Sequence, residues 1–325
     1  MKEHGGYEGN GQTLRILARL GEFSFACGLD LTRRTQLGTI KYPVFYSEVA
    51  NYQIDHGSDS GSQNSTQTSD RWNIDAWSPP KCVYDSDNET IEWILQPLAK
   101  SDRQQFRAIK KEEARHHRSI HKGFDTSIME LADDIAYGVH DLEDALALGL
   151  VSQTSWKTTV AAELTAMPSN PISEEINFYN RELFSNSNSN RKHAISKLVG
   201  YFIRNIEVRE LDQFEHPLLR FQATMQQDAY QVLLALKKFV MKEVILRPEL
   251  QALQFKGQQV IIKLFEIFLE NPQRLLPRDV YRLYEESEKD YRVIADYIAG
   301  MTDVSAGKLY HKLMTPTSGS IFDRI

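Results

Sequence analysis

Acidic residues are concentrated in one short stretch, residues 130–145, whose sequence is ELADDIAYGVHDLEDA. Aspartate is a poor helix former because its short carboxylate competes for backbone groups, so four aspartates in sixteen residues need a reason. Asp133, Tyr137 and Asp141 fall four residues apart and would form a ridge on a helix, rotating by about 40° per step. Apolar residues at helical spacing predict a buried stripe beside this ridge; they are Ile128, Leu131, Ile135, Val139, Leu142 and Leu146.

Two interpretations of this ridge follow from the chemistry of its side chains. Carboxylates ligate hard divalent cations, and tyrosine and aspartate hydrogen-bond polar ligands such as sugar hydroxyls, which indicates a binding site. The alternative is a solvated acidic face, which accounts well for Asp134, Glu143 and Asp144. It accounts less well for Asp133 and Asp141, because like charges along one face of a helix repel.

Other polar clusters are weaker candidates for a site. His117 and His121 lie four residues apart and could share a helix face that binds a transition metal. No carboxylate or cysteine completes that set, and a solvated basic turn is the favoured interpretation. Arg292 and Lys308 could reach a phosphate, although surface ion pairs with Asp296 or Glu288 would explain them at least as well.

The bulk composition limits the class of protein. The chain has 325 residues, of which 41% are hydrophobic and 25% charged, enough for one large or two medium domains with a core. The net charge of −6 does not favour binding to duplex nucleic acid. Cys27 and Cys82, the two cysteines, fit neither a disulfide scaffold nor a cysteine-type zinc site. With no apolar signal peptide and no apolar run of membrane length, we expect a cytoplasmic protein without a membrane partner.

Helical periodicity dominates the chain. No segment alternates convincingly at period two, so the sequence predicts an all-α fold. The segments with the clearest helical periodicity are residues 11–28, 31–43, 88–100, 228–246, 258–270, 291–300 and 306–314.

Polar low-complexity stretches predict surface loops at residues 57–70 and 184–192. The segment MPSNP, residues 167–171, is the best candidate for an internal division. We therefore expect a first part of the helical core at residues 1–166 and a C-terminal helical region at residues 167–325.

Two helix ends bear on the candidate site. One predicted helix ends at Pro43, because the residue before a proline disfavours helical geometry, and this places Lys41 and Tyr42 at its end. The helix of the acidic stretch is expected to begin at Asp125 or Ser127. Ser127 stands three residues before a glutamate, which is the spacing of a capping box.

Five stretches, in order along the chain, resemble the dGTPase branch of the HD-domain phosphohydrolases. LADDIAYGVHDLEDA is the closest, and the others are GYEGNGQTLRILARL, GLDLTRRTQLGTIKYP, KCVYDSDNETIEWI and YRVIADYIAGMTDVSAGKLY, at residues 131–145, 6–20, 28–43, 81–94 and 291–310. Ordered matches over nearly the whole chain make the resemblance specific. It implies an HD-domain-like helical bundle with a C-terminal helical extension, assembled as a homo-oligomer. Asn10 and Gln12 match a family segment near the active site, although both could equally be helix caps.

The resemblance also implies an activity and a set of site residues. Such enzymes hydrolyse a deoxynucleoside triphosphate, typically dGTP, to the deoxynucleoside and triphosphate, as water attacks the α-phosphorus. Asp133 then matches a ligand of a divalent metal ion, Mg²⁺ or Mn²⁺. Tyr137 and Asp141 match the pair that contacts the deoxyribose. Lys41 and Tyr42 match a pair that approaches the phosphates.

Part of the family's site has no match in this sequence. In the family, a His and a His-Asp pair complete the metal site, and a catalytic His and Glu follow. All of them precede the segment matched at residues 6–20, and this sequence starts six residues before Tyr7. VHD at residues 139–141 is no replacement, because Asp141 already matches the sugar contact. With Asp133 as the sole ligand, a divalent ion should bind poorly.

The expectation is therefore a dGTP triphosphohydrolase-like protein whose isolated chain is weakly active or inactive. One alternative is a catalytically inactive member of the family that binds deoxynucleotides or serves as an oligomer partner. Another is a helical interaction protein with a solvated acidic helix.

Overall fold

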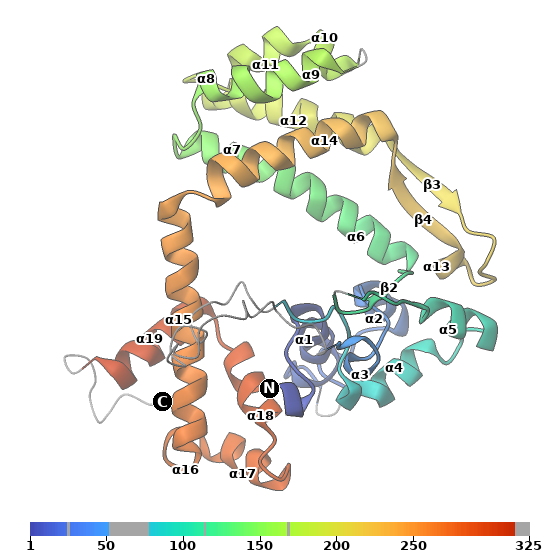
Figure 1. The fold of residues 1–325 in the computed structure, drawn as a ribbon, viewed down its shortest axis with the longest axis vertical. Helices are drawn as coiled ribbons and strands as arrows, with labels where there is room; N and C mark the ends of the chain where they lie inside the picture. Colours follow the sequence, from blue (N-terminus) through green and yellow to red (C-terminus); the bar gives the residue numbers. More distant parts are fainter. Residues whose placement is uncertain (25–26, 52–77, 114, 168–169, 316–325) are drawn as a thin grey trace, which may run out of the picture. The chain divides into compact units, whose positions relative to one another are not determined.

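The computed structural model describes residues 1–24, 27–51, 78–113, 115–167 and 170–315. The loop predicted at residues 57–70 lies outside the described residues. Helices make up most of the described chain, and its strands form two short antiparallel pairs, so the predicted all-α class is confirmed (Figure 1). No helix among these residues has the length and apolar character needed to cross a membrane.

The chain folds into two compact units. Unit 1 comprises Met1–Thr126, Asp212–Arg220 and Gln259–Ile325, and unit 2 comprises Ser127–Leu211 and Phe221–Gln258. The boundary predicted at residue 167 falls inside unit 2, and the division into residues 1–166 and 167–325 stays a prediction.

Unit 1 is built from short helices and one two-stranded ladder. Its elements are η1 (Lys2–His4), α1 (Gly9–Arg15), η2 (Ile16–Leu20), α2 (Arg33–Thr39), α3 (Tyr46–Val49), η5 (Asp85–Asp87), α4 (Asn88–Leu95), α5 (Lys100–Phe106), β1 (Ile109–Lys110), β2 (Arg118–Ser119), α13 (Pro217–Arg220), α16 (Pro272–Leu275), α17 (Arg278–Glu286), α18 (Tyr291–Ala299) and α19 (Asp303–Met314). One apolar core of this unit contains Leu264, Phe268, Tyr284, Ile294 and Ile298, which are all buried.

Unit 2 is a helical body with a β-hairpin. Its elements are η6 (Ala136–His140), α7 (Asp141–Ala147), α8 (Gln153–Trp156), η7 (Lys157–Ala161), α9 (Ala162–Ala166), α10 (Pro171–Glu174), α11 (Ile176–Glu182), α12 (Asn188–Arg204), β3 (Ile206–Glu210), β4 (Phe221–Met225), α14 (Gln227–Val240) and η8 (Met241–Ile245). Two further helices, α6 (Phe124–Ile135) and α15 (Pro248–Glu270), have residues in both units.

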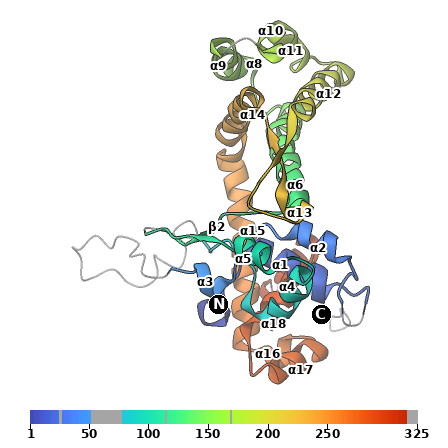
Figure 2. The same ribbon diagram turned by 90° about the vertical axis from the view of Figure 1, so that its right-hand side faces the viewer.

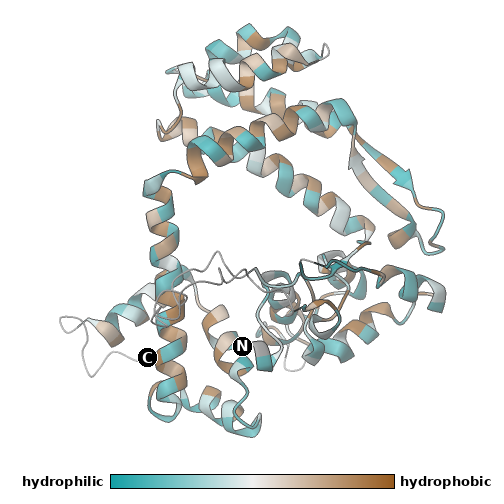
Figure 3. Ribbon diagram, viewed as in Figure 1, coloured by the Kyte–Doolittle hydropathy of each residue, from teal (hydrophilic) through white to brown (hydrophobic). Residues whose placement is uncertain are grey.

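The core of unit 2 forms around α14. This helix packs against η6, α7 and α12, and Figure 2 shows α12 and α14 close together. Val232, Leu233 and Leu236 on its buried face are inaccessible to solvent. Apolar and polar residues alternate along α14 in Figure 3, because one face meets the core and the other meets solvent. Trp156 is also buried, and its indole Nε1 donates a hydrogen bond of 2.8 Å to Asn180 Oδ1.

Two features of unit 2 differ from what the sequence pattern predicts. β3 pairs antiparallel with β4, from Ile206 opposite Met225 to Glu210 opposite Phe221. The last three residues of β3 are exposed, so this strand has no alternating buried face that a sequence pattern could reveal. The loop predicted at residues 184–192 is wrong from residue 188 onward, because α12 begins there. Ser187 caps that helix by accepting a hydrogen bond from the backbone N–H of Asn190.

Candidate functional site

The acidic stretch forms a helix whose winding changes in the middle. α6 ends at Ile135, the next five residues form the π-helical turn η6, and α7 begins at Asp141. π-helical turns inside α-helices occur frequently at functional sites. Since a π-helix advances by a smaller angle per residue than an α-helix, η6 offsets part of the rotation expected between Asp133 and Asp141.

The buried stripe of this helix follows the prediction, except at its start. Ile135, Val139, Leu142 and Leu146 are buried in the core of unit 2, and Leu131 packs against them.

Ile128 is instead 46% exposed, so the prediction for this residue is wrong. The neighbouring Ser127 faces β4, where its Oγ accepts a hydrogen bond of 2.8 Å from the backbone N–H of Ala223. The helix begins at Phe124, so the expected capping role of Ser127 is wrong as well.

The ridge residues differ in their exposure. Asp133 is exposed, whereas Tyr137 and Asp141 are half-buried. Burial raises the pKa of Asp141 above its usual value, and the carboxylates of Asp144 and Asp133 raise this pKa further. Asp133 therefore contributes to the electrostatic environment of Asp141.

Tyr137 has a polar atom without a hydrogen-bond partner among the described residues. Its Oη is buried and makes no hydrogen bond to any residue that the structure describes. Burial raises the pKa of this phenol above its usual value, Asp141 adds to the rise and Lys237 of α14 opposes it. A buried hydroxyl without a partner costs about 1–3 kcal/mol, which a ligand could recover by bonding to it.

Lys41 and Tyr42 follow the end of a helix. α2 ends at Thr39, and Lys41 and Tyr42, which follow Ile40, are half-buried in unit 1. Asp133, Tyr137 and Asp141 belong to unit 2. That all five contribute to one site therefore stays a prediction.

The described residues hold no group of three or more His, Cys, Asp or Glu side chains placed to bind a metal ion. Asp133 as a metal ligand stays a prediction. His117 and His121 do not share a helix face, because β2 begins at Arg118 between them. His117 Nδ1 instead accepts a hydrogen bond of 3.2 Å from the backbone N–H of Glu112.

Arg292 is a buried structural residue. It is 3% exposed, and its Nη2 donates to the carbonyl oxygens of His4, Gly5 and Gly6. Its guanidinium also lies 3.6 Å from the centroid of the Tyr84 ring. The surface ion pair suggested by the sequence is therefore wrong for Arg292, whereas its contact with a phosphate stays a prediction.

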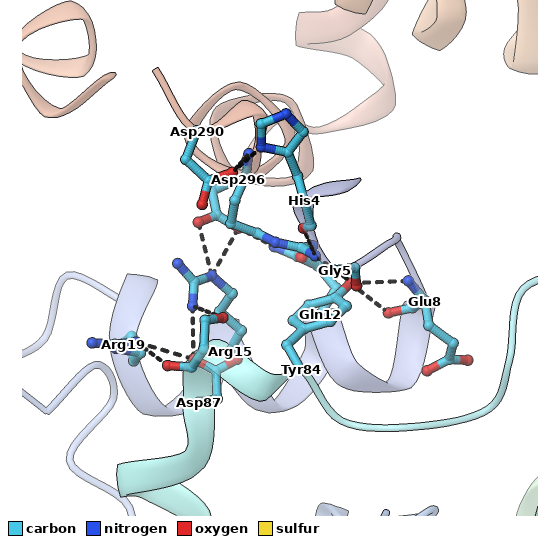
Figure 4. Close-up of polar contacts among 12 residues, drawn as sticks. His4, Gly5, Glu8, Gln12, Arg15, Arg19, Tyr84, Asp87, Asp290 and Asp296 are labelled. Carbon is cyan, nitrogen blue, oxygen red and sulfur yellow. Dashed lines mark hydrogen bonds and ion pairs between the residues drawn. The ribbon is translucent and has the colours of Figure 1, made fainter. Parts of the chain in front are cut away.

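The acid proposed as its partner, Asp296, belongs to another network. It pairs with Arg15 at 2.8 Å and accepts a hydrogen bond of 2.9 Å from Gln12 Nε2 (Figure 4). Glu8 caps α1 by accepting hydrogen bonds from the backbone N–H groups of Asn10 and Gly11. The capping role that the sequence left open for Asn10 and Gln12 thus belongs to Glu8.

Comparison with known proteins adds the evolutionary context. The model of a phosphohydrolase-associated domain matches residues 223–312. The chain is 43% identical to the deoxyguanosinetriphosphate triphosphohydrolase-like protein of Shewanella baltica (strain OS223), over 98% of this chain and 72% of that relative. Proteins of the same name from Shewanella sediminis and Shewanella pealeana are 42% and 41% identical, each over 99% of this chain and 72% of the relative.

Proposed function

The chain belongs to the deoxyguanosinetriphosphate triphosphohydrolase-like family of HD phosphohydrolases, and we propose that it binds a deoxynucleoside triphosphate for hydrolysis to the deoxynucleoside and triphosphate. The observation that carries the proposal is the 43% identity over 98% of the chain to a relative that is named for this activity. dGTP is the first substrate to test, because that name specifies it.

The deoxyribose would meet the buried part of the ridge. The unpartnered Tyr137 Oη can donate a hydrogen bond to a sugar oxygen or accept one from a sugar hydroxyl. Asp141 is partly desolvated, which raises its pKa, so its carboxylate gains from a hydroxyl that donates to it. These properties support a role in binding a small polar ligand.

The triphosphate needs cations, because its charge must be neutralised where it binds. In our proposal the Lys41 ammonium contacts phosphate oxygens, and Tyr42 beside it adds a phenol hydroxyl. This assignment rests on the match of both residues to the family motif.

HD phosphohydrolases generally use divalent metal ions. In our proposal Asp133 is the one ridge carboxylate exposed enough to reach such an ion. The described side chains do not group into a set of three metal ligands, so by themselves they do not fit the ion, and we derive no step through it.

Binding and hydrolysis are tested separately. The affinity for dGTP is measured by equilibrium dialysis, and triphosphate release is measured with Mg²⁺ and with Mn²⁺. We expect Asp141→Asn and Tyr137→Phe to weaken dGTP binding by about tenfold, as expected for losing one hydrogen bond to a desolvated group. Asp144→Asn removes an exposed carboxylate from the same helix and should change the affinity less than about twofold.

Each outcome decides between the candidate functions. Wild-type protein that neither binds a deoxynucleoside triphosphate nor releases triphosphate would overturn the proposal. Binding that depends on Asp141 without any release would overturn hydrolysis. It would support the non-catalytic binding protein that the sequence left open.

A further inference from the structure

A lysine from a neighbouring helix reaches the ridge. Lys237 of α14 forms an ion pair with Asp134, the residue that follows Asp133, and its Nζ lies 5.5 Å from the centroid of the Tyr137 ring. All of these residues belong to unit 2. Asp134 fitted a solvated acidic face from its place in the sequence, whereas in the structure it has a cationic partner.

Close packing of two helices brings Lys237 to this position. Gly138 of η6 faces α14 so closely that an added Cβ would lie 2.7 Å from Leu233 Cδ1 and 3.4 Å from Lys237 Cγ. The aliphatic stem of Lys237 therefore passes beside the backbone of Gly138, one residue after Tyr137.

The neighbouring lysine makes a different contact. Lys238 has a side chain that is 69% exposed and lies 3.8 Å from Glu163, whereas the Lys237 side chain is only 25% exposed. Two adjacent lysines of α14 thus offer one partly buried cation at the ridge and one solvated cation away from it.

The ammonium acts on the ring of Tyr137. A cation within about 6 Å of an aromatic centroid is attracted to the face of the ring by about 0.5–2 kcal/mol. Lys237 also opposes the rise in the pKa of Tyr137 that burial and Asp141 cause. Since the phenol makes no hydrogen bond to the described residues, the orientation of its ring depends on packing and on this cation.

We infer that Lys237, held by Asp134, is a positioning residue that fixes the ring of Tyr137 in the orientation in which its hydroxyl meets the bound ligand. The identity of that ligand rests on the proposed function. The placement of the Tyr137 ring does not rest on the proposed function, because it is argued from the contacts of Lys237 alone.

The first experiment observes the ring directly. Protein labelled with 3-fluorotyrosine gives a ¹⁹F resonance for Tyr137, which is assigned by its loss in Tyr137→Phe. Lys237→Met keeps the stem and removes the charge, and we expect it to shift and broaden this resonance. Lys237→Arg should restore the line, and the matched control Lys238→Met should leave it unchanged. An unchanged line in correctly folded Lys237→Met protein would overturn the inference.

The second experiment separates positioning from direct contact with the ligand. We expect Lys237→Met to weaken dGTP binding by about three- to fivefold, the size of one cation–ring contact. In a Tyr137→Ala background the same change should have less than about a twofold effect, because the ring it acts on is gone. A loss of equal size in both backgrounds would mean that Lys237 contacts the ligand itself. If wild-type protein does not bind dGTP, the proposed function fails, whereas the ¹⁹F line still tests the position of the ring.

Discussion

Burial has the largest influence on the protonation of Asp141. The folded state holds the proton of Asp141 more tightly than the unfolded state does, because its pKa is raised by burial and then by Asp144 and Asp133. For a carboxyl group with a raised folded-state pKa, ionisation costs stability at neutral pH. This cost is absent below the unfolded-state pKa, where the group is protonated in both states. The ionised Asp141 carboxylate therefore destabilises the folded state at neutral pH.

The first prediction is that Asp141→Asn raises the Tm at pH 7. The amide has nearly the same shape and carries no charge to desolvate. As the pH falls through the pKa of Asp141, the wild-type side chain also becomes neutral, so the difference in Tm should shrink. Thermal unfolding followed by circular dichroism between pH 7 and acidic pH measures this. A variant less stable than wild type at pH 7 would mean that the Asp141 carboxylate stabilises the fold.

The second prediction concerns the two cysteines. Cys82 is buried, and burial raises its pKa, whereas Cys27 is exposed. Because the thiolate is the reactive form and must be accessible, a disulfide reagent should label Cys27 alone in the folded protein. Unfolding in denaturant should expose the second thiol. Cys27→Ser protein is the control and should react only when unfolded; rapid reaction of this folded variant would contradict the burial of Cys82.

Among the secondary-structure elements, the close packing of η6 against α14 limits which side chain residue 138 can carry. The third prediction is that Gly138→Ala lowers the free energy of unfolding by about 1–3 kcal/mol, as overpacking a filled core does. Its Cβ would lie 2.7 Å from Leu233 Cδ1, so α14 or η6 must shift. Urea denaturation measures the change.

A second glycine provides the control with the opposite sign. Gly257 lies in α15, and an added Cβ there would meet nothing within 4 Å. Gly257→Ala should therefore stabilise the protein by about 0.5–1 kcal/mol, because alanine loses less backbone entropy in a helix. Equal effects of the two substitutions would show that the contact with Leu233 does not determine the result.

Elements that a local sequence pattern determines were predicted, whereas features that depend on contacts between distant residues were not. The stripe of Ile135, Val139 and Leu142 was predicted, because burial of one helix face leaves a periodic pattern in the sequence. The π-helical turn leaves no such pattern, and Gly138 within it packs against a helix that is distant in sequence. Ser127 was misassigned for the same reason: its partner, Ala223, is 96 positions away in the chain.

The residues of the candidate site differ in the same respect: some were predicted from a local pattern and one was not. Asp133, Tyr137 and Asp141 were found from their own spacing within one helix. Lys237 was missed, because nothing near it in the sequence indicates that it meets Tyr137. Lys237 and Lys238 are adjacent and lie about 100° apart around the helix, so the sequence indicates only that they meet different neighbours.

At the scale of the whole molecule, polar contacts within unit 1 join parts of the chain that are far apart in sequence. His4 pairs with Asp290 at 3.0 Å, and its ring stacks on Tyr291 with the centroids 4.1 Å apart. Arg15 bridges Asp296 and Asp87, at 2.8 Å and 2.7 Å (Figure 4). These contacts connect the first residues of the chain to α18. We therefore expect the loss of these contacts to lower the stability of unit 1 as a whole.

The fourth prediction tests this connection through Arg292. Arg292→Met leaves the carbonyl groups of His4, Gly5 and Gly6 without their buried donor and removes the cation from the Tyr84 ring. We expect a loss of about 3–5 kcal/mol in the free energy of unfolding, the range for breaking a buried charged network.

The location of the effect is as informative as its size. Hydrogen exchange should show reduced protection in residues 1–15 and in α18, while α14 in unit 2 stays protected. Arg282→Met is the matched control, because the contact of Arg282 with Glu286 is an exposed ion pair of 3.8 Å, whose loss should cost less than about 1 kcal/mol. If the two arginine variants were equally stable, the carbonyl contacts of Arg292 would contribute nothing beyond a surface charge. Because the network lies wholly within unit 1, a loss of protection confined to unit 2 would equally contradict the assignment.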